Sequence, residues 1–287
     1  MNKIVVIGAG TMGNGIAHVF AQYAFPVYLV DLNAEQLEKA MATISKNLDR
    51  QVQKGILSIE EKINVLNRIH PVQNIRESVQ GADIIIEAAT ENENIKLRIF
   101  RELDEYASPE AILASNTSSI SITKIAAVTK RPTQVIGMHF MNPVPLMKLV
   151  EVINGYATAG YVTEKIIELT NKLGKTPCVV KDYPGFISNR ILMPMINEAI
   201  ISLQEGVASA EAIDTVMKLG MAHPMGPLQL ADFIGLDVCL AIMKVLQEGF
   251  GNPKYAPATL LVNMVAAGNL GVKSGEGFYN YHTKATP

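Results

Sequence analysis

The sequence predicts an α/β domain with a mostly parallel sheet, followed by a second domain that is all helical. In the first two-thirds of the chain, short β-branched runs alternate with longer helical patterns, which is typical of a parallel sheet covered by helices. After the segment Asp182–Gly185 the strand signal nearly disappears. We therefore expect two domains, 1–183 and 184–287, and a chain of 287 residues is long enough for both.

The elements of the first domain follow from β-branched runs and from the helical spacing of apolar residues. The predicted strands are Lys3–Ile7, Val27–Val30, Asp83–Glu87, Ile112–Ser115, Val135–Met138, Lys148–Ile153 and Pro177–Lys181. The predicted helices are Met12–Ala24, Ala34–Lys54, Ile59–Asn67, Glu93–Ala107 and Val162–Gly174. Capping boxes are expected where Ser58 precedes Glu61 and where Thr90 precedes Glu93.

The second domain is expected to hold a long apolar helix, Pro184–Gly206, then a helix Ala210–Leu219 capped by Ser209, then a helix Leu228–Gly249. These helices are apolar on more than one side. A surface of that kind often lies between subunits, so we expect a homodimer formed through this domain. A well-buried core would give a similar pattern, and that alternative stays open.

Composition and charge exclude several classes of protein. The net charge of −2 argues against a nucleic-acid binder that relies on a general basic field. No apolar run approaches the length of a membrane helix, and the N-terminus lacks the pattern of a signal peptide. Cys178 and Cys239 form no metal or redox motif, and no other cluster has metal-ligand spacing. We expect a cytoplasmic protein with no nucleic-acid partner, no membrane partner and no metal.

The segment Gly8-Ala9-Gly10-Thr11-Met12-Gly13 links the first predicted strand to the first predicted helix. Glycine spacing in this strand–loop–helix context indicates a Rossmann-type dinucleotide site. Gly8 allows the tight turn, Gly10 lets a pyrophosphate approach the backbone, and Gly13 lets the helix pack close to the sheet. The N–H groups that begin the helix then face the phosphates.

Asp31 follows the second strand, 21 residues after Gly10. A carboxylate there can accept hydrogen bonds from the adenosine ribose hydroxyls of NAD, and it would repel the 2′-phosphate of NADP. Leu32 and Asn33 offer no positive charge to offset that repulsion. The predicted cofactor is therefore NAD.

Three later segments, together with the glycine loop, carry a family resemblance. They are Ser115–Ser119, His139–Pro145 and Pro184–Arg190, and the tail Lys273–Tyr279 extends the likeness. With these motifs in this order, the chain resembles the L-3-hydroxyacyl-CoA dehydrogenases, most of all the stand-alone bacterial 3-hydroxybutyryl-CoA dehydrogenases. The resemblance covers essentially the whole chain.

Oxidising a secondary alcohol with NAD requires a base that takes the hydroxyl proton near neutral pH, and histidine suits that task. His139 ends a predicted strand at the edge of the sheet where open α/β sheets bind ligands. Glu151 lies 12 residues later, in a strand that can fold back beside it. The resemblance implies that His139 is the catalytic acid/base and that Glu151 is its partner.

The resemblance also implies roles for residues outside this pair. It places Ser118 and Asn189 on the 3-oxygen of the substrate, with Asn189 entering from the second domain. Five residues match cofactor positions of the family, namely Glu91, Lys96, Ser118, Asn142 and Lys273. Lys96 could equally be a solvated lysine on its helix.

The helix Ala34–Lys54 is longer than a crossover helix needs, and one of its faces is basic. This basic stripe consists of Lys39, Lys46, Arg50 and Lys54. It is either a solvated charged face or a surface that meets the phosphates of coenzyme A. The resemblance places Lys54, and more weakly Asn47, on coenzyme A.

Together these observations predict a reversible, NAD-dependent dehydrogenase of a short-chain L-3-hydroxyacyl-CoA, with an acyl-CoA as its substrate. The short chain is implied by the resemblance alone. Two other functions stay open: a dehydrogenase of a free hydroxy acid or sugar acid, such as a gulonate dehydrogenase, and a non-catalytic NAD(H)-binding sensor. A pure sensor would have no reason to keep the set of His139, Glu151, Ser118 and Asn189.

Overall fold

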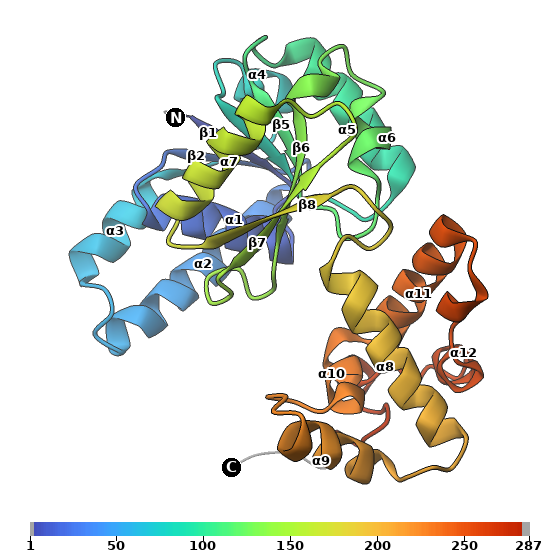
Figure 1. Ribbon diagram of the computed structural model, residues 1–287. Coiled ribbons are helices and arrows are strands. Elements are labelled where there is room, and N and C mark those ends of the chain that lie inside the picture. Colours follow the sequence, from blue (N-terminus) through green and yellow to red (C-terminus); the bar gives the residue numbers. More distant parts are fainter. Residues whose placement is uncertain (1–2, 283–287) are drawn as a thin grey trace. The chain divides into compact units, whose positions relative to one another are not determined.

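The computed structural model describes residues 3–282, and the chain divides into two compact units. The first unit spans residues 1–183 and the second spans residues 184–287. These ranges equal those expected for the two domains. Figure 1 shows that the first unit is a sheet with helices on both faces, whereas the second unit is built from helices.

The sheet of the first unit has eight strands in the order β3-β2-β1-β4-β5-β6-β7-β8. In chain order they are Ile4–Ile7, Val27–Val30, Ile69–Val72, Ile84–Glu87, Ile112–Ser115, Val135–Phe140, Leu149–Asn154 and Thr176–Lys181. All neighbouring strands are parallel except β6 and β7, which are antiparallel. The mostly parallel sheet is thus confirmed. From β1 the chain winds one way to β2 and the other way to β4, so ligands are expected at the carboxyl ends of these strands.

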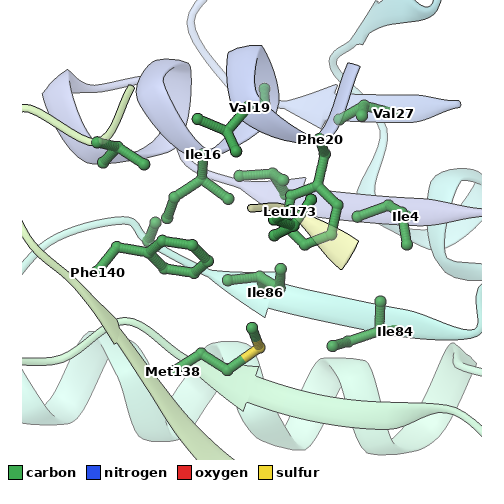
Figure 2. Close-up of a cluster of buried hydrophobic side chains, with 14 of the residues drawn as sticks. Ile4, Ile16, Val19, Phe20, Val27, Ile84, Ile86, Met138, Phe140 and Leu173 are labelled. Atoms are coloured by element: carbon green, nitrogen blue, oxygen red, sulfur yellow. The ribbon is translucent and has the colours of Figure 1, made fainter. Parts of the chain in front are cut away.

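Apolar side chains from the sheet and from the helices that cover it build the core of the first unit (Figure 2). Ile16 and Phe20 of the first helix lie against Ile84, Ile86 and other strand residues. The helices and 3₁₀ turns of this unit are α1 Thr11–Gln22, α2 Ala34–Gln53, α3 Ile59–Asn67, α4 Ile75–Val79, α5 Glu93–Tyr106, α6 Ile122–Ala126, η1 Pro132–Gln134 and α7 Gly160–Lys172. Strand β1 is buried along its whole length, as expected for a strand covered by helices on both faces.

The structure confirms one of the two capping boxes. Ser58 accepts from the backbone of Glu61, whose side chain accepts from the backbone of Ser58. The predicted box at Thr90 is wrong, because α5 is capped by Asn92, which accepts from Ile95 N at 3.1 Å. Strand β3 was not predicted, since its central residues are exposed and include a proline, which is tolerated at the edge of a sheet.

The second unit contains α8 Ser188–Gln204, α9 Ala210–Gly220, α10 Pro227–Ile234, α11 Leu236–Phe250, η2 Pro253–Tyr255, α12 Thr259–Ala266 and η3 Val272–Ser274. Its described residues form only isolated β-bridges, in agreement with an all-helical domain. The cap at Ser209 is confirmed, because its hydroxyl accepts from Ala212 N.

Two predicted helices of the second unit have different bounds. The helix predicted from Pro184 begins at Ser188, because Gly185 and Phe186 have left-handed backbone angles (φ 74° and 51°) that interrupt a helix. The helix predicted at Leu228–Gly249 is two helices, α10 and α11. Gly235 separates them with φ 101°, a backbone angle that favours glycine.

The described part of the chain, residues 3–282, has no helix with both the length and the apolar character needed to cross a bilayer. Within the same residues, no three or more His, Cys, Asp or Glu side chains gather where they could hold a metal ion.

Candidate active site

The glycine loop between β1 and α1 is packed on one side and open on the other. A Cβ on Gly8 (φ 98°) would meet Ala88 O at 2.7 Å, and one on Gly13 would overlap Gly8 O. A Cβ on Gly10 would meet nothing within 4 Å. No side chain caps the N-terminus of α1. The loop therefore offers an open approach at Gly10 and backbone donors beside it, an arrangement that fits the pyrophosphate of a dinucleotide.

Asp31 and Gln36 hold this loop in place. The Asp31 carboxylate accepts from Ala9 N at 2.8 Å and from Asn33 N at 3.0 Å. Gln36 donates its side-chain amide to Ala9 O at 2.9 Å. Asp31 thus lies at the glycine loop, as its sequence position suggests, and it orders the backbone there. Its contact with a ribose stays a prediction.

His139 and Glu151 lie opposite each other on the antiparallel strands β6 and β7. Paired residues of such strands project from the same face of the sheet. His139 Nδ1 and Glu151 Oε2 are 2.8 Å apart, and the residues are only 7% and 2% exposed. A carboxylate on Nδ1 selects the neutral tautomer in which Nε2 is the proton acceptor. The strand that carries Glu151 therefore folds back beside His139 as predicted.

Glu91 organises the segment that follows β5. One of its oxygens accepts from the Thr117 hydroxyl at 2.6 Å, from Ser118 N at 2.9 Å, and from both the backbone and the hydroxyl of Ser119. Burial acts to raise the pKa of Glu91, but the Lys96 ammonium and these hydrogen bonds together hold it below its usual value. The backbone of Ser118 is thereby fixed by a carboxylate that stays ionised.

Lys96 is 1% exposed, so its interpretation as a solvated lysine is wrong. Its ammonium contacts both oxygens of Glu87 at 2.8 Å and lies 3.6 Å from Glu91. Glu87 is fully buried at the end of β4 and also accepts from the Ser115 hydroxyl and from Ala89 N. Glu87 was not predicted as a site residue, although a charged residue that ends a β-branched strand is an available signal.

A second residue that the sequence analysis missed joins two strand ends. The side-chain oxygen of Asn116 accepts from Phe140 N at 2.9 Å, next to His139. The end of β5, which precedes Ser118, is thus tied to the end of β6.

A hollow of about 300 Å³ lies beside the glycine loop, between α1, α2 and the loop that follows β6. Its lining consists of Thr11, Asn14, Gly15, Gln36, Lys39, Ala40, Thr43, Asn47 and Asn142–Pro145. Three predicted site residues, Thr11, Asn47 and Asn142, therefore share one hollow. Of the basic stripe only Lys39 lines it. Lys54 lies seven residues beyond Asn47, about 10 Å farther along the axis of α2.

Asn189 and Lys273 belong to the second unit. Asn189 lies in the first turn of α8. Lys273 lies in η3, and its ammonium forms an ion pair with Asp237 of α11. The predicted roles of both residues at a site of the first unit stay predictions.

Two family models match the chain. The model described as the NAD-binding domain of 3-hydroxyacyl-CoA dehydrogenase covers residues 3–183, and the model of its C-terminal domain covers residues 185–281.

Individual relatives match over nearly the full length. A probable 3-hydroxybutyryl-CoA dehydrogenase of Bacillus subtilis is 54% identical over 286 residues, which are 100% of this chain and 99% of that protein. A 3-hydroxybutyryl-CoA dehydrogenase of Bradyrhizobium diazoefficiens is 55% identical over 281 residues, which cover 98% of this chain and 96% of that protein.

A solved structure agrees with these matches. The crystal structure of the (S)-3-hydroxybutyryl-CoA dehydrogenase of Ralstonia eutropha superposes with a TM-score of 0.96 at 49% identity, covering 99% of this chain and 100% of that chain. Because the family models together span both units, this chain belongs to the 3-hydroxyacyl-CoA dehydrogenase family of NAD-dependent oxidoreductases.

Proposed function

We propose that this protein catalyses the reversible NAD-dependent oxidation of a short-chain L-3-hydroxyacyl-CoA to the 3-ketoacyl-CoA. The observation that carries this proposal is the buried contact of 2.8 Å between His139 and Glu151 at the carboxyl edge of a dinucleotide-binding sheet. The names of the relatives at 54% and 55% identity support 3-hydroxybutyryl-CoA and acetoacetyl-CoA as the substrate pair.

His139 is the acid/base in this proposal. In the oxidation direction Nε2 takes the proton of the 3-hydroxyl, the electron pair left on the oxygen forms the new C=O bond, and the C3–H bond breaks with its electron pair leaving as a hydride. Bound NAD⁺ supplies the acceptor for the departing hydride. Glu151 holds the ring by its Nδ1 side and stabilises the imidazolium that forms. In the reverse direction His139 returns the proton to the 3-oxygen.

Ser118 and Asn189 are proposed to donate hydrogen bonds to the 3-oxygen while charge develops on it. The fixed position of Ser118 supports its part, because Glu91 binds the backbone of both Ser118 and Ser119. Asn189 lies in the first turn of its helix, and its part rests on the family resemblance.

The glycine loop, from Gly8 to Gly13, is proposed to hold the pyrophosphate of NAD, and Asp31 the adenosine ribose. The carboxylate side chain of Asp31 would repel the 2′-phosphate of NADP. Near the nicotinamide ribose we propose Glu91 and Lys96, and we propose Ser118, Asn142 and Lys273 as further cofactor contacts. Lys96 acts there through its ion pairs with Glu87 and Glu91.

The hollow beside the glycine loop is proposed to take part of coenzyme A. The residues that line it supply carboxamides, hydroxyls and the Lys39 ammonium, and they include no carboxylate. Such a lining suits the amides and phosphates of the coenzyme. Asn47 contacts it there, and Lys54 meets its phosphates at the end of α2.

The test is NADH oxidation with acetoacetyl-CoA, compared with free acetoacetate and with NADPH in place of NADH. We expect turnover of the thioester, little turnover of the free acid, and a lower KM for NADH than for NADPH. Equal rates with acetoacetate would favour a dehydrogenase of free acids, and equal KM values would refute the role of Asp31.

We further propose that the protein is a homodimer formed through its second unit. An apolar groove of about 440 Å³ lies between α8 and α9, and Val207, Val216 and Leu219 beside it are more than half exposed. A second copy of this chain would cover these side chains. Sedimentation equilibrium tests this, with a monomer expected for Val216→Glu and a monomeric parent protein contradicting it. The predicted cytoplasmic location stays a prediction, consistent with two free cysteines.

A further inference from the structure

The loop Met141–Lys148 connects β6 to β7, so it joins the strand of His139 to the strand of Glu151. Its first half, Asn142–Pro145, forms one wall of the hollow beside the glycine loop. The position of this short loop therefore decides the shape of that hollow.

Lys175 contacts this loop. In the sequence it follows α7 and directly precedes β8. It is 8% exposed, and its ammonium donates to Val144 O and to Met147 O at 2.6 Å each. No carboxylate of residues 3–282 lies within ion-pair distance of it. Burial lowers the pKa of Lys175 from its usual value.

A buried ammonium without a counter-ion costs free energy that an apolar side chain of similar length would not. Both hydrogen bonds of Lys175 go to carbonyls of the same loop, one at each side of its turn. The charge therefore strengthens a contact with one segment of the backbone.

The other side of the loop packs against α1. A Cβ on Gly15 would meet Val144 Cβ at 2.9 Å, so the backbone of α1 is in close contact with the Val144 side chain. Val144 is 2% exposed. The loop is thus held between Gly15 on one side and Lys175 on the other.

We infer that Lys175 is a positioning residue that fixes the loop Met141–Lys148 as a wall of the acyl-CoA site. This inference rests on the proposed function of the hollow. The His139–Glu151 pair is held independently, because the β6–β7 ladder fixes its register on both sides. Loss of Lys175 therefore weakens substrate binding and leaves the chemical step nearly intact.

The test compares Lys175→Met with Lys172→Met, which removes an exposed lysine at the end of α7 and serves as the matched control. Each variant is assayed with acetoacetyl-CoA and with S-acetoacetyl-N-acetylcysteamine, a truncated thioester without the nucleotide. For Lys175→Met we expect the KM for acetoacetyl-CoA to rise about tenfold, the equivalent of one charge-assisted hydrogen bond. The kcat, and the KM for the truncated thioester, should stay within about threefold, and Lys172→Met should match the parent.

An equal rise in KM for both thioesters, or no rise for either of them, overturns the inference. If Lys175→Met does not fold, Lys175→Gln is examined by amide hydrogen exchange. Faster exchange confined to residues 141–148 supports the inference, and uniform acceleration overturns it. Failure of both variants to fold makes Lys175 a stability residue and also overturns it. A parent enzyme that does not turn over acetoacetyl-CoA refutes the proposed function instead, and the exchange experiment still tests the loop.

Discussion

Buried carboxylates have different kinds of partner in the two units. In the first unit each of two such groups faces a group that carries or can take positive charge: Glu87 faces Lys96, and Glu151 faces His139. In the second unit Asp214 and Asp232, 2% and 1% exposed, accept hydrogen bonds from neutral donors. These donors are the backbone N–H groups of Leu228, Gln229, Phe278 and Tyr279 and the hydroxyls of Tyr279 and Tyr281.

The difference separates two uses of a buried charge. Compensated pairs at the sheet edge hold His139 and the start of α5 in defined positions, and His139 is the proposed acid/base. The two aspartates instead hold parts of the chain together. Asp214 caps the start of α10, where the helix dipole favours an anion, and Asp232 ties the segment Phe278–Tyr281 to the same helix.

The largest effect on stability is expected from Lys96→Met, which leaves Glu87 buried without its cation. We expect the free energy of unfolding to fall by about 3–5 kcal/mol, measured by urea denaturation. Adding Glu87→Gln should recover part of this loss. A loss below about 1 kcal/mol would mean that a carboxylate of the first unit tolerates neutral surroundings as Asp232 does.

His139→Ala removes the proposed acid/base from the first set. We expect kcat with acetoacetyl-CoA to fall at least about a hundredfold while NADH still binds, as followed by fluorescence titration. His70→Ala, an exposed histidine of the edge strand β3, is the control and should keep its turnover. Near-normal turnover of His139→Ala would refute the acid/base assignment.

Asp232→Asn tests the second set. One acceptor oxygen is replaced by an amide nitrogen that faces N–H or O–H donors, so we expect a loss of about 1–3 kcal/mol in the stability of the second unit. Glu248→Gln, on the exposed side of α11, should change nothing. An unchanged melting curve for Asp232→Asn would show that the stability of the second unit does not depend on a carboxylate at this position.

The pH dependence sharpens the same comparison. Burial raises the pKa of Asp232, so the folded state binds its proton more tightly than the unfolded state does. This contribution to stability is present at low pH and is lost as the pH rises through the raised pKa. Asp232→Asn should remove that component, so the stability gap between parent and variant should narrow with rising pH.

Features encoded within one short segment were predictable from the sequence. The glycine loop and the hairpin that carries His139 and Glu151 depend on spacings of 5 and 12 residues along the chain. Partners distant in sequence were not predictable. Lys175 lies 31 residues from Val144, and Asn116 lies 24 residues from Phe140, so no local pattern connects them.

A single backbone angle accounts for one further difference, and a contact with a neighbouring strand accounts for another. The apolar pattern continues through Gly235, and only its positive φ divides the helix into α10 and α11. Lys96 follows the spacing of an ordinary helix lysine, and its burial depends on Glu87 of a neighbouring strand.

The antiparallel pairing of β6 and β7 has a consequence for divergence within such a fold. His139 and Glu151 are carried by one hairpin, so the loop between them can change in length while their register is kept by the ladder. A one-residue insertion inside either strand would instead turn one member of the pair to the opposite face of the sheet. Substrate range can therefore change through the connecting loop while the pairing of His139 with Glu151 is kept.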